Sequence, residues 1–182
     1  EFRRVLFRSI LRGAVILNTV LTAPGDELSL PTTLRLAKTP VVGEIILEGV
    51  VSIFDQLPGL QDDPASMPQD VVDLYARPVN ESGNGKGPLA IVRMAADRVD
   101  HPTAEQARVT ESFIQRADIP AEIVWGMNDS LLDDRLDDMI ELFPNARVTE
   151  TTAGHFLQEE AEGPQAIAAA IVRVRDDIDS SP

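Results

Sequence analysis

The segments Trp125–Asp129 and Thr152–Glu160 hold the two residues with the clearest capacity for chemistry, Asp129 and His155. A histidine that acts as a general base needs a carboxylate on its far ring nitrogen, which fixes the tautomer and stabilises the imidazolium. Such a histidine can take a proton from water or from a nucleophile. We therefore predict an acid–base pair in which His155 is the base and Asp129 is the acid that orients it.

Two predicted strands carry this pair. Residues 120–126 and 146–151 have the pattern of short strands, and each is followed by residues with helical spacing. The order strand–helix–strand–helix predicts an α/β fold, with a parallel sheet and helices on its faces. Because catalytic groups in such sheets gather beyond the carboxyl ends of the strands, we expect Asp129 and His155 to lie close together.

Each residue of the pair also has a simpler interpretation. Asp129 precedes a predicted helix and is suited to cap its first turn. His155 is suited to pack beside Phe156 as an ordinary loop histidine. The order of acid before histidine, and the position of each just past a strand, favour the acid–base pair over these alternatives.

The helices that follow the two strands are defined by apolar spacing and by one proline. Pro164 is well placed in the first turn of a helix predicted over 164–178. The preceding helix is expected to use as its apolar face Leu132, Leu136, Met139, Ile140 and Phe143.

The first part of the chain predicts one strand and then a helical region. Residues 13–19 form a continuous apolar run, which predicts a central strand buried on both faces. Residues 22–116 interrupt the sheet with helices. The helices expected there are a pair within 30–54 that meet near Pro40, one over 70–77 that stops before Pro78, and two more over 88–98 and 103–116.

The glycine-rich stretch at residues 80–87 invites a phosphate-loop interpretation, which we reject. A phosphate loop needs a preceding strand, four residues between its first glycine and Gly-Lys, and then Ser or Thr. Here Gly87 follows Lys86 and the strand is missing. We predict a flexible surface loop.

Composition limits the partners. The net charge of -14 repels nucleic acid and anionic lipid, and no apolar run reaches the roughly 18 residues of a membrane span. Cysteine is absent, as is compatible with a cytoplasmic protein. With only two histidines, His101 and His155, far apart in the sequence, a zinc site is improbable, and we expect no metal or cofactor.

Three motifs resemble the C-terminal part of α/β-hydrolases, and within that superfamily they are most similar to haloalkane dehalogenases and their close relatives. The motifs are Trp125–Asp129 with the three residues after it, Phe143–Ala146 and Ala153–Glu159. Residues 15–19 resemble the strand that leads into the cap domain of these enzymes, and Tyr75–Pro78 resembles a cap motif. The resemblance implies four segments: a doubtful or artefactual segment 1–11, a core strand 12–21, a helical cap region 22–116 and a C-terminal core 117–182.

The opening of the chain has two interpretations. Residues 1–12 carry four arginines and one glutamate, so they are basic on an acidic protein. They are either an arginine-rich targeting segment or an artefactual end, and we favour the second interpretation.

The resemblance also implies roles for individual residues. His155 activates water to hydrolyse a covalent ester intermediate, and Asp129 is its acid, since Asn18 at the alternative acid position is uncharged. The substrate is expected to be a small apolar organic molecule. Positions that line the apolar pocket of relatives match Leu131, Leu132 and Phe156, for which core packing is an equally good interpretation.

The chain departs from the family at the nucleophile. No glycine-flanked aspartate or serine elbow is present: Asp26, Asp55 and Asp129 all lack the flanking glycines, and Trp125, the sole tryptophan, falls in a strand rather than the cap. We therefore expect a fragment of a larger enzyme, inactive alone, in which half of the sheet is missing and the exposed sheet edge is a site of possible association.

Alternative functions remain open. Because the nucleophile decides the chemistry, the alternatives are an epoxide hydrolase, a lactone decarboxylase or an esterase. An epoxide hydrolase would need a cap tyrosine; Tyr75 is the sole tyrosine and its context before Pro78 indicates a structural role, so this alternative ranks below the dehalogenase. A non-catalytic interaction protein that kept the fold and lost the nucleophile is the alternative from another class.

Overall fold

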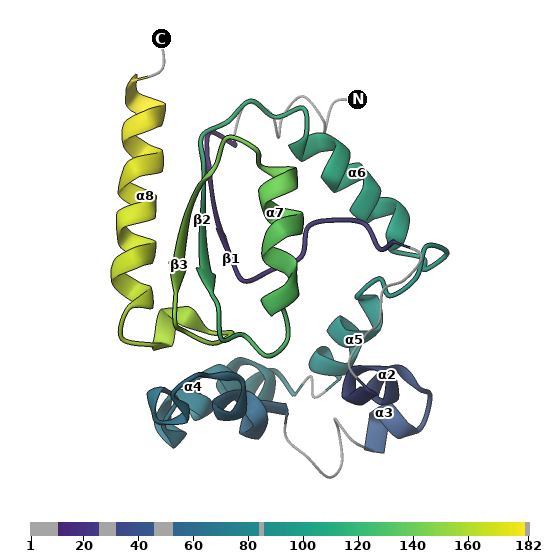
Figure 1. Cartoon of the computed structure of the whole chain (residues 1–182). Helices are drawn as coiled ribbons and strands as arrows, with labels where there is room; N and C mark the ends of the chain where they lie inside the picture. Colours follow the sequence, from purple (N-terminus) through teal and green to yellow (C-terminus); the bar gives the residue numbers. More distant parts are fainter. Residues whose placement is uncertain (1–10, 26–31, 46–52, 84–85, 181–182) are drawn as a thin grey trace.

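The computed structural model describes residues 11–25, 32–45, 53–83 and 86–180. It contains a sheet of three parallel strands in the order β1-β2-β3 (Figure 1). The α/β class predicted from the sequence is confirmed. The strands are β1 (Ala14–Leu17), β2 (Ala121–Gly126) and β3 (Arg147–Thr151).

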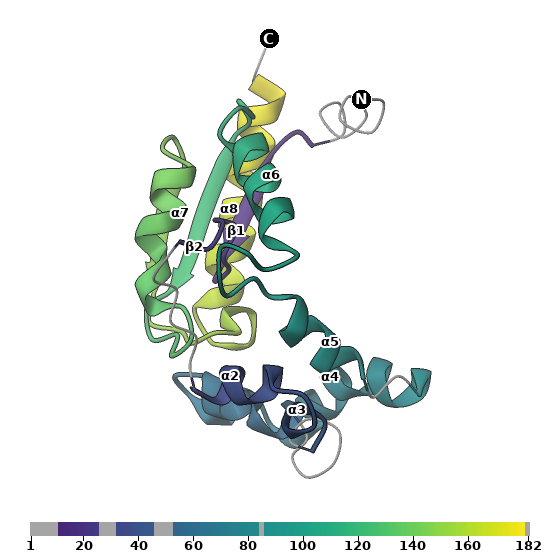
Figure 2. The ribbon, with the colours of Figure 1, turned by 90° about the vertical axis from the view of Figure 1, so that its right-hand side faces the viewer.

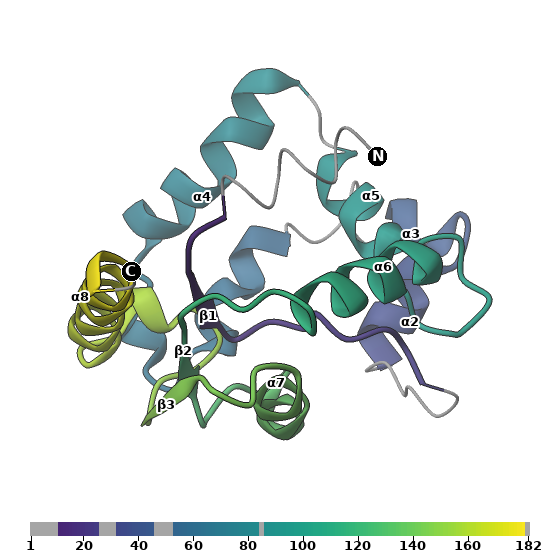
Figure 3. The same cartoon turned by 90° about the horizontal axis from the view of Figure 1, so that it is seen from above.

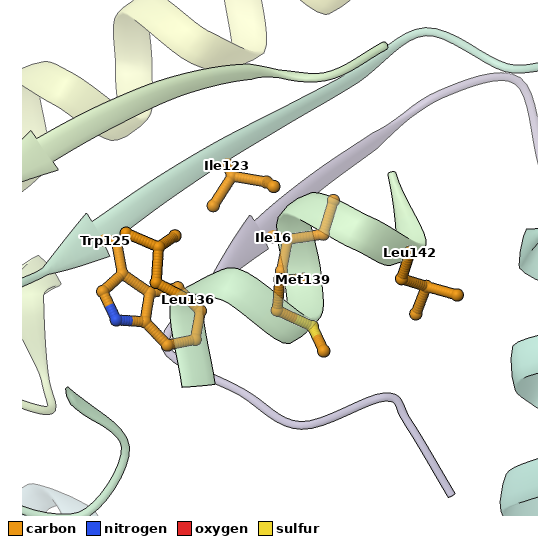
Figure 4. Close-up of a cluster of buried hydrophobic side chains, with 6 residues drawn as sticks. All are labelled: Ile16, Ile123, Trp125, Leu136, Met139 and Leu142. Atoms are coloured by element: carbon orange, nitrogen blue, oxygen red, sulfur yellow. The ribbon is translucent and has the colours of Figure 1, made fainter. Parts of the chain in front are cut away.

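The middle strand, β2, is the centre of the core because helices cover both of its faces. Seen from above, α7 (Leu136–Leu142) and α8 (Gly163–Ser180) lie on opposite sides of the sheet (Figure 3). Alternate residues of β2 point to opposite faces. On the α7 face, Figure 4 shows the buried cluster of Ile16, Ile123, Trp125, Leu136, Met139 and Leu142. The α8 face buries Val124, Ala153, Leu157 and Ala170.

The remaining helices lie mainly beyond the carboxyl ends of the strands (Figures 1 and 2). The exception is α6, which lies beside the sheet near β1. No helix in the described ranges has the length and apolarity needed to cross a membrane. These elements are α2 (Thr32–Lys38), α3 (Val42–Glu44), η2 (Ile53–Leu60), η3 (Pro64–Ser66), α4 (Gln69–Ser82), α5 (Gly87–Met94) and α6 (Ala104–Ile114).

The division into segments stays a prediction. Residues 1–10, most of the doubtful opening segment, lie outside the described residues, and so do parts of the predicted 30–54 helices. Between α2 and α3 the chain turns at residues 39–41, close to the predicted break at Pro40. Two short 3-10 turns, η4 (Asp133–Arg135) and η5 (Leu157–Glu159), complete the fold.

The prediction that a helix stops before Pro78 was wrong, because α4 continues through this proline to Ser82. Pro78 has no N–H for the Leu74 carbonyl, but both residues are exposed, so water can satisfy that oxygen. The helix ends instead at Gly83, whose φ of 66° is the left-handed conformation that glycine adopts at low cost. The glycine-rich stretch thus begins inside a helix, and residues 84–85 lie outside the described residues.

Two other helix predictions needed correction. The helix predicted over 88–98 ends at Met94. In α7, Ile140 is 39% exposed and Leu142 is buried in its place. The apolar stripe of α7 runs from Leu136 through Met139 to Leu142, so Ile140 falls on its rim.

The first strand, predicted to be central, lies at an edge of the three-stranded sheet. The Ala14 N–H donates to the Pro120 carbonyl at 3.0 Å. Because successive residues of a parallel strand turn their backbone groups to opposite sides, those of Val15 and Leu17 face away from β2. An apolar groove of about 420 Å³ borders β1 and is also lined by Phe113, Ile114 and Phe143.

Candidate active site

The structure brings Asp129 and His155 together at the carboxyl ends of β2 and β3. The Nδ1 atom of His155 is 2.8 Å from Oδ2 of Asp129. Asp129 is fully buried, whereas the His155 side chain remains 22% exposed. A carboxylate only accepts hydrogen bonds, so Nδ1 carries the proton and donates it. This tautomer leaves the lone pair on Nε2 available to accept a proton.

Asp129 uses its two oxygens for two different tasks. Oδ1 accepts from the N–H groups of Leu131 (2.8 Å) and Leu132 (3.3 Å), which closes a turn over residues 129–132. Asp129 is not a helix cap, because η4 begins at Asp133 with Leu132 at its N-cap position and α7 follows at Leu136. Oδ2 accepts from His155 and from the Asn18 amide, the latter at 2.7 Å. Burial raises the pKa of Asp129, but the hydrogen bonds from His155, Asn18 and Leu131 outweigh it and hold that pKa below its usual value. The residue is therefore a stable carboxylate opposite the histidine.

Asn18 has a role that sequence reasoning missed. Its Oδ1 accepts from the Gly126 N–H at 2.8 Å, and its Nδ2 donates to the Gly126 carbonyl at 3.1 Å as well as to Asp129. The side-chain amide thereby continues the β1–β2 ladder past the last paired residue of β1 and reaches the acid. The sequence suggested only that Asn18 is not itself the acid.

Two glycines allow the loop that carries His155 to approach its neighbours. A Cβ on Gly126 would lie 2.5 Å from the carbonyl oxygens of Ala153 and Gly154. A Cβ on Gly154 would lie 2.5 Å from the carbonyl oxygen of Leu60. Any larger residue would push the histidine loop away from β2 or from the end of η2. These contacts explain the glycine in the sequence motifs that contain Asp129 and His155.

The histidine loop also contacts residues 60–62, far away in the sequence. The His155 N–H donates to the Leu60 carbonyl at 2.9 Å. Gln61 is buried and bonds both backbone groups of Phe156. Sequence reasoning missed Gln61 and Glu160, whose Oε1 accepts from the Asp62 N–H at 2.9 Å and the Gly154 N–H at 3.0 Å. Gln61 belongs to no local pattern that points to this site. Glu160 ends the segment that contains His155, but the sequence gives no indication of its two contacts.

The three residues predicted to line a substrate pocket lie around the pair in different ways. Phe156 is half-buried, and its ring makes an edge contact with the His155 ring at a centroid distance of 4.9 Å. Leu131 is also half-buried. Leu132 packs against the core cluster that contains Trp125. Contact with a substrate stays a prediction for all three, and core packing accounts for Leu132 directly.

Two aromatic residues considered from the sequence lie in different surroundings. Tyr75 donates its hydroxyl proton to Glu159 at 2.7 Å and accepts from Gln158 at 3.0 Å. Burial, and then the bond to Glu159, raises the pKa of Tyr75. Trp125 is fully buried in the core, where it has no access to a ligand.

The second histidine, His101, has hydrogen-bonding partners away from the acid–base pair. His101 bonds Thr103 through Nδ1 and lies within 3.1 Å of the Arg93 carbonyl through Nε2. Within the described part of the chain, no cluster of three or more His, Asp or Glu side chains is placed to hold a metal ion.

Comparisons with known proteins support the fold. No family model and no curated protein matches the sequence. A solved structure of the haloalkane dehalogenase DbeA-M1 loop variant from Bradyrhizobium elkanii matches 96% of this chain and 67% of its own, with a TM-score of 0.69 and 17% sequence identity. The fold is of the α/β class and is similar to part of the dehalogenase fold. At that identity the likeness concerns architecture alone, so the chemistry of this chain depends on its own residues.

Proposed function

We propose that this chain forms part of a hydrolase that resembles haloalkane dehalogenases, in which His155 activates water. The observation that supports the proposal best is the 2.8 Å contact between His155 Nδ1 and the buried Asp129, because it leaves Nε2 free to accept a proton. The dehalogenase-like fold agrees with this role. Small apolar organic molecules are the proposed substrates, with Phe156 and Leu131 beside the base.

The proposed reaction has two steps. A carboxylate nucleophile attacks a substrate carbon, and the halide leaves with its bonding electron pair, so that an ester forms. Water then attacks the ester carbonyl carbon while His155 Nε2 takes its proton. The tetrahedral intermediate collapses, and the proton held by His155 passes to the departing alcohol oxygen. The carboxylic acid that remains releases the second proton of the water to solvent, which restores the carboxylate. Asp129 holds the imidazole orientation and stabilises the imidazolium throughout.

The nucleophile is absent from the 182 residues, because no aspartate or serine stands between glycines in an elbow. We propose that it comes from residues outside this sequence. Without the nucleophile no ester forms, so the chain alone has no intermediate for the His155-activated water to hydrolyse. A related hydrolase that acts on epoxides, lactones or esters would share the same base. The engaged hydroxyl of Tyr75 weighs against the epoxide reaction, which needs a free donor for the ring oxygen.

A pair of measurements tests the proposed reaction. The 182-residue chain should release no halide from haloalkanes and no product from epoxides or esters above the level of its His155→Ala variant. In a form that also carries the nucleophile, His155→Ala should stop turnover and accumulate the ester, which intact-protein mass spectrometry detects as an added alkyl group. The proposal fails if that variant turns over normally, or if the 182 residues alone hydrolyse substrate in a His155-dependent way.

One observation favours the alternative of an interaction protein, namely the outward-facing backbone of β1. Unpaired strand edges next to apolar surface invite pairing with another strand. Under this alternative the chain associates through Val15 and Leu17, and sedimentation should show concentration-dependent oligomers. Val15→Pro removes one outward N–H without touching the β2 ladder, so it should weaken that association. A chain that stays monomeric at all concentrations contradicts the alternative.

A further inference from the structure

Residues 60–62 contact three successive residues of the histidine loop. The Leu60 carbonyl and the Gln61 Cα lie so close to Gly154 that no Cβ fits between them. The Leu60 carbonyl also accepts the N–H of His155 at 2.9 Å. Gln61 bonds Phe156, the next residue. The loop is therefore held on both sides of the base by one short segment distant in sequence.

Gln61 makes the most specific of these contacts. Its Oε1 accepts from the Phe156 N–H at 2.9 Å, and its Nε2 donates to the Phe156 carbonyl at 3.0 Å. The side-chain amide thus pairs with both backbone groups of one residue, as a neighbouring strand would. The Gln61 amide nitrogen also lies 3.3 Å from the Ser66 hydroxyl, so the amide has a fixed orientation. Only 7% of Gln61 is exposed, and leaving the Phe156 groups unpaired there is costly.

Contacts next to the Gln61–Phe156 pairing connect the same segment to the residues that carry the acid and the base. Asp62 accepts from the Asn128 amide at 2.8 Å, and Asn128 also donates to the Thr152 carbonyl at 2.9 Å. Asn128 directly precedes Asp129, so the same segment touches the loop of the acid. Because the direction of the His155 ring depends on the backbone of the loop that carries it, a fixed Phe156 limits how far the ring can turn from Asp129.

We infer that Gln61 is a positioning residue for the base: it fixes the backbone of Phe156 and thereby keeps the His155 ring bonded to Asp129. This role rests on the proposed function of His155 as the base. Gln61 does not reach the reacting atoms, so its effect is on geometry. The segment 60–62 therefore supports the acid–base pair, although it belongs to the helical region 22–116 predicted from the sequence.

Three variants isolate the role of Gln61. Gln61→Met keeps a similar volume and removes both hydrogen bonds to Phe156. Gln61→Glu keeps the acceptor for the Phe156 N–H and loses the donor to its carbonyl. Gln69→Met is the matched control, since Gln69 is an exposed glutamine that bonds only Asp73 among the described contacts.

The readouts are two proton signals observed by NMR in the intact chain. The first is the imidazole Nδ1–H of His155, which exchanges slowly with water only while it is bonded to Asp129. The second is the amide exchange of Phe156, measured against the core amide of Val124 as an internal reference.

We expect Gln61→Met to accelerate Phe156 exchange by about tenfold or more, as for the loss of one to two hydrogen bonds, and to broaden or remove the Nδ1–H signal. Gln61→Glu should give an intermediate result, and Gln69→Met should match the wild type.

Two results overturn the inference. An unchanged Nδ1–H signal in Gln61→Met means that Gln61 holds Phe156 without positioning the base. Equal acceleration at Val124 and Phe156 means that Gln61 contributes only to overall stability. If Gln61→Met fails to fold, the same criteria apply to Gln61→Glu. Failure of the proposed function is recognised separately, by normal turnover of the His155→Ala variant in a form that carries the nucleophile, a result that does not depend on Gln61.

Discussion

Two fully buried carboxylates stand at opposite ends of β2, and their partners differ in kind. Glu122, near the amino end, is held by Arg173 at 3.0 and 2.7 Å and by Arg147, which also bonds Asp177. Asp129, beyond the carboxyl end, is held by a histidine, an amide and backbone N–H groups. Two permanent cations neutralise Glu122, whereas the partners of Asp129 include a group that can gain and lose a proton. Equal burial therefore supports a structural ion cluster at one end and a candidate for chemistry at the other.

The same balance of forces acts on both carboxyl groups. Burial raises the pKa of Glu122, but the hydrogen bonds from Arg173 and Arg147 outweigh it and lower that pKa below its usual value. For Asp129 the opposing contributions are neutral donors and His155. Neutralising Glu122 and Asp129 one at a time should therefore show which carboxylate matters for stability and which for turnover.

The largest expected effect concerns the chemical end. Asp129→Asn places an amide against Nδ1 and favours the wrong tautomer of His155, which in comparable triads lowers kcat by about 10⁴-fold. In a form of the protein that carries the nucleophile, we expect a loss of that order in ester hydrolysis, measured by single-turnover kinetics. Glu122→Gln in the same form should keep kcat within a fewfold of the original. If the two variants lose activity equally, the contrast between the two ends of β2 is wrong.

The next effect concerns the structural end. Glu122→Gln leaves Arg147 and Arg173 without their shared anion, and we expect the free energy of unfolding to fall by about 2 kcal/mol. This is less than for a fully buried pair, since both arginines remain partly exposed. Urea titration followed by circular dichroism measures the change. Glu150→Gln on the exposed side of β3 is the matched control and should change stability little.

The contact between Asp129 and His155 was the part of the site that the sequence predicted best. Both residues follow strand ends and stand in glycine motifs, which are local signals, and the strands themselves were predicted to within one or two residues. The partners that hold the pair left no such signal. Gln61 bonds a residue 95 positions away and Asn18 one 108 positions away, and a single polar residue carries no indication of its distant partner.

The structural end could not be predicted for a related reason. Glu122 lies in a strand, and its burial depends on arginines from two other elements, α8 and β3. Predictions of where helices end and which residues they bury also failed where solvent exposure, rather than local sequence, was decisive. Pro78 was expected to stop a helix, but an exposed carbonyl four residues earlier costs little. Ile140 is exposed and Leu142 is buried because the buried stripe of α7 runs through Leu136, Met139 and Leu142, a choice that composition alone does not make.

The smallest effect is the loss of stability at low pH, to which Glu122 and Asp129 should both contribute. Each has a pKa lowered by folding, so the unfolded chain binds protons more readily as the pH falls. Their stabilisation is complete above the unfolded pKa values of about 4, and it is lost as the pH decreases through the lower folded values.

Each group contributes a slope of at most about 1.4 kcal/mol per pH unit in that window. Urea unfolding between pH 6 and pH 3 should therefore show a shallower acid decline in Glu122→Gln and in Asp129→Asn than in the wild type, and the shallowest in the double variant. A decline that is unchanged in Asp129→Asn but reduced in Glu122→Gln would mean that the neutral donors around Asp129 favour its charged form less than the arginines favour that of Glu122. The two ends of β2 would then differ in electrostatic strength as well as in chemistry.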